Sequence, residues 1–338
     1  MSLPPFPDGW YAVGLSDELP RNAMITRTFC GDEVVIFRKS DGDLAAVDAY
    51  CPHLGAHMGK GGHIKEDTLV CPFHAFRFDG DGKCVATGYG TKPPPKALLK
   101  TWPVLDLNGL VMLYHDGEGA LPAWEPPKMG WEDWTPLQAH RLEAESHPQE
   151  TTENSVDLGH LSVVHGYEAV DILEPLEVDG PYLTAKYTMT RVNPWLKALP
   201  AIVTSFRVHV WGLGYSMVEI YTQNFDFNFR LFILPMPIDG ERVAIRIAVS
   251  VRKDCAPANI SPALALLPRS FFLRFLRKAT LDGVANDVRQ DFDIWQHKKY
   301  VQPPLLVKGD GPIGPYRRYC RQFYPEFRTG SRGAATVS

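Results

Sequence analysis

The stretch CPHLGAHMGKGGHIKEDTLVCPFH, residues 51–74, decides how the N-terminal part of the chain folds. It contains two cysteines and four histidines, set between segments that have the composition of ordinary strands. Thiolates and imidazoles are the ligands that zinc and iron–sulfur clusters take from proteins. This concentration of both groups predicts a metal site and loops that wrap around it.

Two short pairs in this stretch are spaced as metal ligands. Cys51-x-His53 is followed by 17 residues and then by Cys71-x-x-His74. A structural zinc site is one interpretation, but zinc modules usually pair like with like, whereas each pair here mixes cysteine with histidine. A Rieske [2Fe–2S] centre needs that mixture, because one iron takes two thiolates and the other takes two imidazoles. We therefore expect Cys51 and Cys71 to hold one iron, and His53 and His74 the other.

The remaining histidines of the stretch, His57 and His63, belong to no spaced pair, and we expect them to lie in the loops without binding metal. The glycines suit loops that approach a cluster closely, with backbone N–H groups directed at sulfur. The stretch thus predicts four ligands and two bystander histidines.

The composition narrows the class of protein. Of the 338 residues, 45% are apolar and 22% are charged, and the net charge is -4. These values are typical of a globular protein and argue against a nucleic-acid partner, which usually requires a basic excess. No run approaches the ~18 consecutive apolar residues of a membrane helix, and the N-terminus lacks a secretory signal. With only six cysteines, we expect a cytoplasmic protein rather than a disulfide scaffold.

The first part of the chain predicts an all-β domain. Residues 10–116 contain many short segments of strand composition, separated by polar or glycine-containing breaks. Asp-Gly, the strongest short hairpin signal, recurs among them. We place this domain at residues 1–120 and a linker, rich in proline and tryptophan, at residues 121–138.

The second part predicts an α+β domain. Helical and strand patterns follow one another in four segments, at 147–166 (helix), 180–252 (strands), 261–279 (helix) and 281–300 (helix). We place this domain at residues 139–328. The polar last ten residues, 329–338, are expected to be disordered.

A second metal site is predicted in the segment ENSVDLGHLSVVHG. Asn154, Asp157 and His160 recur every third residue and are expected to share one helical face. His165 follows His160 by five residues, a turn of about 140° on an ideal helix. Both histidines therefore reach one metal only if the helix is distorted or ends near Gly166.

An iron that binds two histidines and activates O₂ needs a carboxylate as its third ligand. In VANDVRQDFDIWQ, the apolar residues form one helical stripe, and Asp291 lies in its middle by the 100° rule. Asp287 lies at the edge of the stripe, while Asp282 and Asp293 lie on the polar side. A carboxylate that faces a core is costly unless it is paired or coordinated. Asp291 is therefore the predicted third ligand and Asp287 the second choice; a buried aspartate paired with arginine is the alternative.

These motifs resemble the terminal oxygenase components of Rieske non-haem iron oxygenases over nearly the whole chain. Its two signatures occur in the expected order, as the cluster set Cys51, His53, Cys71 and His74 and the D-x-x-H-x₄-H run at Asp157, His160 and His165. A narrower likeness, to the cholesterol 7-desaturases and bacterial 3-ketosteroid 9α-hydroxylase oxygenases, is carried by DAYCPHLGAHMGKGG, CPFHAFRFDGDGKC, QDFDIWQHKKYVQPPLLVKGDGPI and RRYCRQFY. In those relatives the aspartate of the QDxDIW-like run binds iron, which falls on Asp291. The central strands, 168–250, match less.

The resemblance implies a fold, an assembly and partners. The fold is an all-β Rieske domain followed by a helix-grip catalytic domain, in a head-to-tail homotrimer where the cluster of one subunit faces the mononuclear Fe(II) of the next. Asp157 would bridge His74 of the neighbouring subunit to its own His160, with Asn154 near the iron. Because the chain has no dinucleotide-binding fingerprint, a separate ferredoxin or flavin NAD(P)H reductase would supply electrons.

The expected activity is O₂-dependent oxidation of an apolar substrate by hydroxylation, demethylation or desaturation. The resemblance favours a sterol or steroid; another apolar or aromatic compound is the alternative. A Rieske-type electron carrier or a zinc-stabilised binding module is the rival from a different class, but neither needs His160, His165 or Asp291. The helical segment 261–279, with Phe271 among its apolar residues, adds the hypothesis of a peripheral membrane contact.

Overall fold

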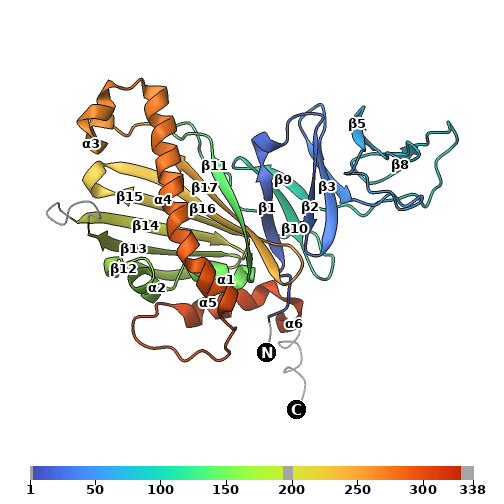
Figure 1. Cartoon of the computed structure of the whole chain (residues 1–338). Helices are drawn as coiled ribbons and strands as arrows, with labels where there is room; N and C mark the ends of the chain where they lie inside the picture. The colour runs from blue at the N-terminus through green and yellow to red at the C-terminus, as the bar shows by residue number, and fades with distance from the viewer. Residues whose placement is uncertain (1–2, 193–200, 329–338) are drawn as a thin grey trace, which may run out of the picture.

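The computed structural model describes residues 3–192 and 201–328, which form two domains (Figure 1). The predicted disordered tail, 329–338, lies outside the described residues. The N-terminal domain consists of strands, while the C-terminal domain combines one broad sheet with helices. The predicted α+β class, with an all-β domain first, is confirmed.

The N-terminal domain contains three small antiparallel sheets. Two form its body, in the orders β1-β10-β9 and β2-β3-β4. The third, β5-β6-β7-β8, forms a separate lobe that projects away from the C-terminal domain (Figure 1). The strands are β1 Gly9–Leu15, β2 Met24–Phe29, β3 Asp32–Arg38, β4 Leu44–Asp48, β5 His63–Lys65, β6 Thr68–Val70, β7 Arg77–Phe78, β8 Cys84–Ala86, β9 Val104–Leu107 and β10 Leu110–His115.

Two hairpins of this domain, β3–β4 and β7–β8, turn where the sequence has Asp-Gly. Gly42 lies between β3 and β4 with a φ of 106°, and Gly82 lies between β7 and β8 with a φ of 76°. A side chain at Gly82 would also meet the carbonyl oxygen of Leu99 at 2.4 Å. Both turns therefore need glycine, which takes a positive φ without a steric penalty.

The C-terminal domain is built on a seven-stranded antiparallel sheet with the order β11-β17-β16-β15-β14-β13-β12. Its first strand thus lies at one edge, beside the last. The strands are β11 Gln138–Glu145, β12 Glu168–Asp179, β13 Tyr182–Arg191, β14 Ile202–Trp211, β15 Tyr215–Thr222, β16 Phe227–Pro237 and β17 Arg242–Val251.

The two faces of this sheet bury side chains against different partners, since successive residues of a strand point to opposite faces. Met217 and Phe232 pack against Trp10 and Tyr114 of the N-terminal domain. On the other face, Val249 and its neighbours pack against helix α4, Arg269–His297, which crosses the sheet diagonally (Figure 1). The space between α4 and strands β13 to β16 contains the site described below.

Helix α4 corrects the sequence prediction of two helices at 261–279 and 281–300. Only a four-residue helix, α3 Pro257–Ile260, and a short 3₁₀ turn at Pro262–Leu266 precede Pro268, and one continuous helix follows it. Proline disfavours a helical residue before it and is tolerated at a helix start, so Pro268 separates the turn from α4. Gly283 does not interrupt the helix, because packing on the sheet outweighs its weak propensity.

The segment 147–166 also differs from the single helix that was predicted. It forms two short helices, α1 Pro148–Glu153 and α2 Leu158–Val163, with a break between them. Asp157 lies in the break as the N-cap of α2, so Asn154, Asp157 and His160 do not share one helical face. Aspartate favours such caps because its side chain accepts a free N–H of the first turn.

The described part of the chain ends with α5, Ile313–Cys320, a 3₁₀ turn at Arg321–Phe323, and α6, Pro325–Arg328. Further 3₁₀ turns lie at Ser16–Glu18 and Gln223–Phe225. Among the helices in the described part of the chain, none combines the length and apolar character required to cross a membrane.

Candidate metal centres and substrate cavity

The two loops that carry the predicted cluster ligands have the same backbone design. In the first, the N–H of Gly55 donates to the carbonyl of Cys51 at 2.9 Å, and the N–H of Cys51 donates to the carbonyl of Ala56 at 2.9 Å. In the second, Ala75 donates to Cys71 at 3.1 Å, and Cys71 donates to Phe76 at 2.8 Å. Each loop therefore presents its cysteine from the same kind of backbone turn, with a histidine two or three residues further on.

The four predicted ligands lie together at the tip of the projecting lobe. The thiols of Cys51 and Cys71 are buried, whereas the rings of His53 and His74 lie nearer the surface with centroids 4.9 Å apart. Burial, and then the neighbouring Cys71 thiol, raise the pKa of Cys51 to about 11. His53 stacks on Phe76 at 4.4 Å, which fixes the plane of its ring.

This tip fits an iron–sulfur cluster. Among the described residues, Nδ1 of His74 is buried and has no hydrogen-bond partner, and the same is true of both ring nitrogens of the neighbouring His57. A buried nitrogen without a partner is costly in an apoprotein, and coordination to iron would satisfy it. The thiols and imidazoles, two of each, are the donor set that a Rieske cluster takes.

The two expected bystanders lie outside these loops. His63 is exposed on β5. His57 has its Nε2 3.4 Å from Glu33 and its ring edge-on to Tyr50, with centroids 5.0 Å apart. Its contacts are thus with a carboxylate and a phenol.

The second predicted site assembles from three elements. His160 lies in α2, His165 follows the end of that helix, and Asp291 comes from α4, with one donor atom of each lying within 4.8 Å of the others. Since α2 ends at Val163 and Gly166 has a φ of 68°, the chain turns His165 back towards His160. Their ring centroids are 5.2 Å apart.

Hydrogen bonds fix the tautomer of each histidine. Nδ1 of His160 donates to the backbone oxygen of Asp157 at 2.6 Å, and Nδ1 of His165 lies 3.3 Å from Oε1 of Gln290. The Nε2 atoms are therefore left as the unprotonated ligands that a metal requires. Nε2 of His165 lies 3.4 Å from Oδ1 of Asp291.

The electrostatics of this site favour a cation. Asp291 is only 5% exposed. Burial alone would lower the pKa of His165, but the carboxylate of Asp291 and the amide of Gln290 outweigh it and raise that pKa. A buried carboxylate that holds a proton on its neighbour will hold a metal ion in its place, because the ion provides more positive charge.

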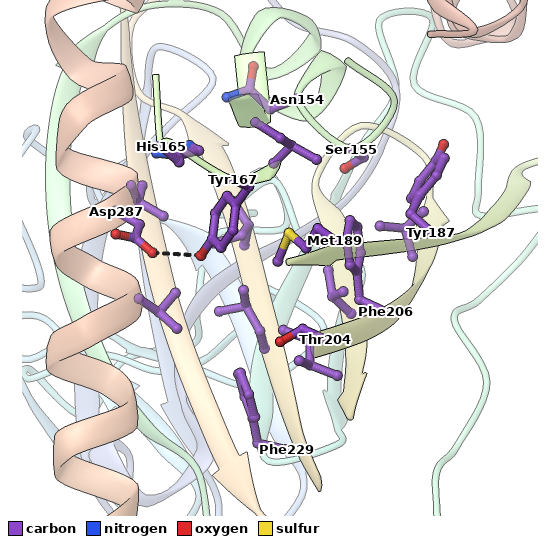
Figure 2. A pocket seen from close by; sticks show the side chains of 18 of the residues that line it. Asn154, Ser155, His165, Tyr167, Tyr187, Met189, Thr204, Phe206, Phe229 and Asp287 are labelled. Atoms are coloured by element: carbon purple, nitrogen blue, oxygen red, sulfur yellow. Dashed lines mark hydrogen bonds between the residues drawn. The ribbon is translucent and has the colours of Figure 1, made fainter. Parts of the chain in front are cut away.

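Asp287, the second choice for the carboxylate, has other partners. Its Oδ2 accepts from the hydroxyl of Tyr167 at 3.0 Å and from Nη1 of Arg191 at 3.3 Å. Figure 2 shows the Tyr167 hydroxyl directed at Asp287. Asp287 thus matches the alternative of an aspartate paired with arginine, while Asp291 lies with the histidines.

Asp157 and Asn154 border the site. Oδ1 of Asp157 accepts the backbone N–H of His160 at 3.1 Å, and the carboxylate is still 29% exposed. Burial would raise the pKa of Asp157, but its contacts with His160 outweigh this effect and lower it. Asn154 lies at the same end of the cavity as Ser155 (Figure 2).

A cavity of about 710 Å³ extends from these residues along the sheet. Alternate residues of β13 to β16 line it, including Met189, Phe206, Phe229 and Leu231, and α4 closes the opposite side (Figure 2). Its volume is within the range of small-molecule sites, and its walls are mostly apolar.

Sequence reasoning did not find Gln290, Tyr167 or Arg191. Gln290 directly precedes Asp291 in the QDFDIW run. Its position next to a predicted iron ligand could have indicated a role at the site. Tyr167 and Arg191 meet Asp287 only through the packing of strands on α4.

Comparison with known families identifies the architecture. Residues 9–103 match the family described as "Rieske [2Fe-2S] domain". Residues 113–324 match the family described as "3-Ketosteroid 9alpha-hydroxylase C-terminal domain". The chain belongs to the Rieske oxygenases. It is a terminal oxygenase component, and its two cofactor sites are the Rieske [2Fe–2S] domain and a His-His-Asp site for mononuclear non-haem iron.

Relatives of this Rieske oxygenase share most of its length. The cholesterol 7-desaturase of Hemicentrotus pulcherrimus is 29% identical, covering 96% of this chain and 71% of that protein. The probable 3-ketosteroid-9-alpha-monooxygenase oxygenase component of Rhodococcus rhodochrous is 29% identical, covering 94% and 79%. The crystal structure of dicamba monooxygenase bound to dicamba superposes with a TM-score of 0.66, at 17% identity over 96% of this chain and 98% of that one. The last match shows the fold alone.

The family assignment sets aside the electron carrier and the zinc-stabilised module. Neither would have a C-terminal domain of this family with two histidines and an aspartate brought together. Members of this class receive electrons from a reductase partner, and the protein is an O₂-dependent enzyme.

Proposed function

We propose that this oxygenase oxidises an elongated, largely apolar substrate of the sterol or steroid class. The observation that carries the proposal is the apolar cavity, about 710 Å³ in volume, that extends from His160, His165 and Asp291. The names of the cholesterol 7-desaturase and the 3-ketosteroid monooxygenase point to the same class of substrate. An apolar or aromatic compound of another class is the second candidate, favoured only by the general apolar character of the walls.

The proposed ligands are Cys51, Cys71, His53 and His74 for the cluster, and His160, His165 and Asp291 for the mononuclear iron. Bound iron supplies O₂ activation at the coordination positions that three protein ligands leave open. The protein contributes orientation: Asp157 and Gln290 hold the Nδ1–H of the two histidines. The apolar walls hold the substrate by burying its surface and exclude water from the site.

The arrangement of the two sites supports a multisubunit assembly. The lobe that carries the predicted cluster ligands and α2 lie on opposite sides of the molecule (Figure 1). Apolar side chains are exposed beside each site, with Phe73 at the tip 61% exposed and Val163 in α2 87% exposed. We therefore propose a head-to-tail homotrimer in which His74 of one subunit approaches Asp157 of the next.

Turnover with a reductase and candidate substrates tests the activity. The purified protein, a ferredoxin or flavin reductase and NAD(P)H are supplied with sterols, 3-ketosteroids and, as a contrast, planar aromatic compounds. Substrate-dependent O₂ uptake with a hydroxylated, demethylated or desaturated steroid product is expected. Coupled product formation from the aromatic compounds alone would contradict the steroid proposal while leaving the oxygenase assignment intact.

A peripheral membrane contact remains a minor proposal for substrate entry. Phe271 and Phe275, one turn apart at the start of α4, are 65% and 52% exposed. Leu276 of the same helix lines the cavity. Vesicles of anionic lipid should co-sediment the protein, and Phe271→Asp should reduce this binding; sedimentation of neither protein would end the proposal.

A further inference from the structure

A group of four buried or half-buried charges lies behind the mononuclear site. It consists of Glu150 and Glu153 from α1, Lys298 directly after α4, and Arg317 from α5. Lys298 and Arg317 come from the QDFDIWQHKKY and RRYCRQFY segments, and neither of these two residues has a part in the proposed chemistry. We call this group the ionic clamp.

Arg317 is the central cation of the clamp. Its Nε and Nη2 donate to the two carboxylate oxygens of Glu153 at 2.7 and 3.0 Å, a paired contact that fixes direction as well as distance. Its Nη1 donates to the carbonyl oxygen of Val301 at 2.6 Å. Arg317 thus joins α1 to the segment that leaves the end of α4.

Lys298 makes a second connection between the same elements. Its Nζ lies 2.9 Å from Glu150 and 3.7 Å from Glu153. The side chains of the two glutamates are only 7% and 6% exposed. Within the described residues, the Glu150 oxygens have no hydrogen bond of good geometry, so the ammonium of Lys298 is the charge that compensates this carboxylate.

The clamp connects directly to the segments that carry the iron ligands. The carbonyl of Glu153 accepts the N–H of Asp157 at 3.1 Å, which is the turn that leads into α2 and His160. The N–H of Lys298 donates to the carbonyl of Ile294 at 2.9 Å, in the last turn of the helix that carries Asp291. A shift of α1 relative to the end of α4 would therefore change the distance between the histidines and Asp291.

We propose that the ionic clamp sets the position of the histidine-bearing segment relative to Asp291, and thereby the affinity of the mononuclear site for Fe(II). Glu150, Glu153, Lys298 and Arg317 are then positioning residues. The inference rests on the proposed ligand set. Stability alone does not account for the clamp, because buried ion pairs are often replaced by neutral residues at no cost in stability. What neutral residues do not reproduce is the direction of the contacts.

The test compares a clamp in which the Lys298–Glu150 pair is neutralised, called here the neutralised clamp, with a neutralised surface pair. Glu150→Gln/Lys298→Met removes one acid and one base together, so neither is left buried without a partner. Asp282→Asn/Lys278→Met removes an exposed ion pair from α4, where Asp282 also contacts His140 of β11, and serves as the control. Iron is extracted from the full protein by a ferrous chelator, while the visible spectrum confirms that the cluster is intact, and unfolding is followed in parallel.

The neutralised clamp should lower Fe(II) affinity by about tenfold, as is common for residues that orient metal ligands. Its midpoint of unfolding should stay close to that of the parent, and the control should retain full affinity. The single substitution Lys298→Arg keeps the positive charge beside Glu150 and should retain most of the parent's affinity for Fe(II).

Unchanged Fe(II) affinity in a folded, neutralised clamp would overturn the proposal. If that variant does not fold, Arg317→Lys takes its place, because it keeps the charge but loses the paired contact with Glu153. Lower Fe(II) affinity in Arg317→Lys would then support the proposal, and unchanged affinity would overturn it. Asp291→Ala is measured beside them, because unchanged affinity there would show instead that the ligand set is wrong.

Discussion

The cluster-binding tip and the mononuclear site are built in opposite ways. The tip takes all its predicted ligands from residues 51–74, held in two loops with the same hydrogen bonds. The mononuclear site takes one histidine from α2, the other from the turn that follows α2, and its carboxylate from α4, far along the chain. A local site can be formed by two hairpins, whereas the second site depends on how the whole domain packs.

The two sites also differ in their surroundings. At the tip the thiols are buried, and exposed side chains such as Phe73 flank the histidines, as expected where electrons enter or leave. At the mononuclear site, Asp291 is buried beside an apolar cavity. This difference agrees with the proposed function, in which one site contacts another protein and the other binds a small apolar molecule.

The largest effect is expected at the buried site. Asp291→Ala should abolish mononuclear iron binding and reduce turnover by more than about a hundredfold, because a direct ligand is lost. The visible spectrum of the cluster should not change. Asp287→Asn is the matched control, one turn away on α4, and should keep its iron; metal analysis of both proteins decides. If Asp287→Asn lost its iron and Asp291→Ala kept it, Asp287 would be the iron ligand in place of Asp291.

A substitution of a cluster ligand should affect the tip and leave the mononuclear site unchanged. His74→Ala should remove the visible absorption of the Rieske cluster, since a ligand is lost, and leave mononuclear Fe(II) binding within about twofold, because the two sites share no ligands. Metal analysis and chelator competition measure both quantities. Linked loss of both metals in a folded protein would show that the sites depend on each other.

The sequence predicted the tip more completely than the second site, because the predicted ligands of the tip lie close together in the chain. Four ligands within a short stretch reveal themselves by spacing, and the mixture of cysteine and histidine indicated the cluster. Asp291 could also be predicted from the sequence, because a carboxylate in the apolar stripe of a helix departs from the ordinary pattern. The break between α1 and α2 was missed, since the pattern of Asn154, Asp157 and His160 fits a helix as well as a cap.

Other features had no local signal. The cavity is lined by alternate residues of four strands, whose pattern is also that of any sheet core. Arg191 meets Asp287, and Arg317 meets Glu153, only because strands and helices far apart in sequence pack together. The continuous α4 was missed because the prediction divided the helix between residues 279 and 281, while in the fold one helix packs on the sheet from Arg269 to His297.

The stability of the protein should depend on pH through His147, at the start of helix α1. Burial lowers the pKa of His147, the N-cap of α1, from 6.5 to about 4. Below pH ~6.5 the unfolded chain binds a proton that the folded chain does not, so the free energy of unfolding should fall by roughly 3 kcal/mol down to pH ~4 and then level off. His147→Asn keeps a capping side chain and should flatten this part of the profile in urea unfolding. An unchanged slope would assign the titration to another group.

The smallest effect is expected from a histidine that neighbours the tip but lies outside both loops. His63→Ala should leave the cluster spectrum, the iron content and turnover within about twofold, since His63 is exposed on β5. This substitution is the control for His74→Ala. A change in the cluster spectrum would contradict the proposed set of four ligands.

The account rests on Asp157 as the connection between the two sites, and one measurement tests it most directly. Asp157→Asn keeps a side-chain oxygen to cap α2 but removes the charge, so both metals should remain bound. The reduced parent protein, mixed with O₂ and substrate, should recover its oxidised visible spectrum and form product in a single turnover, whereas Asp157→Asn should do so about a hundredfold more slowly. Equal rates in the two proteins, with both metals present, would contradict the account.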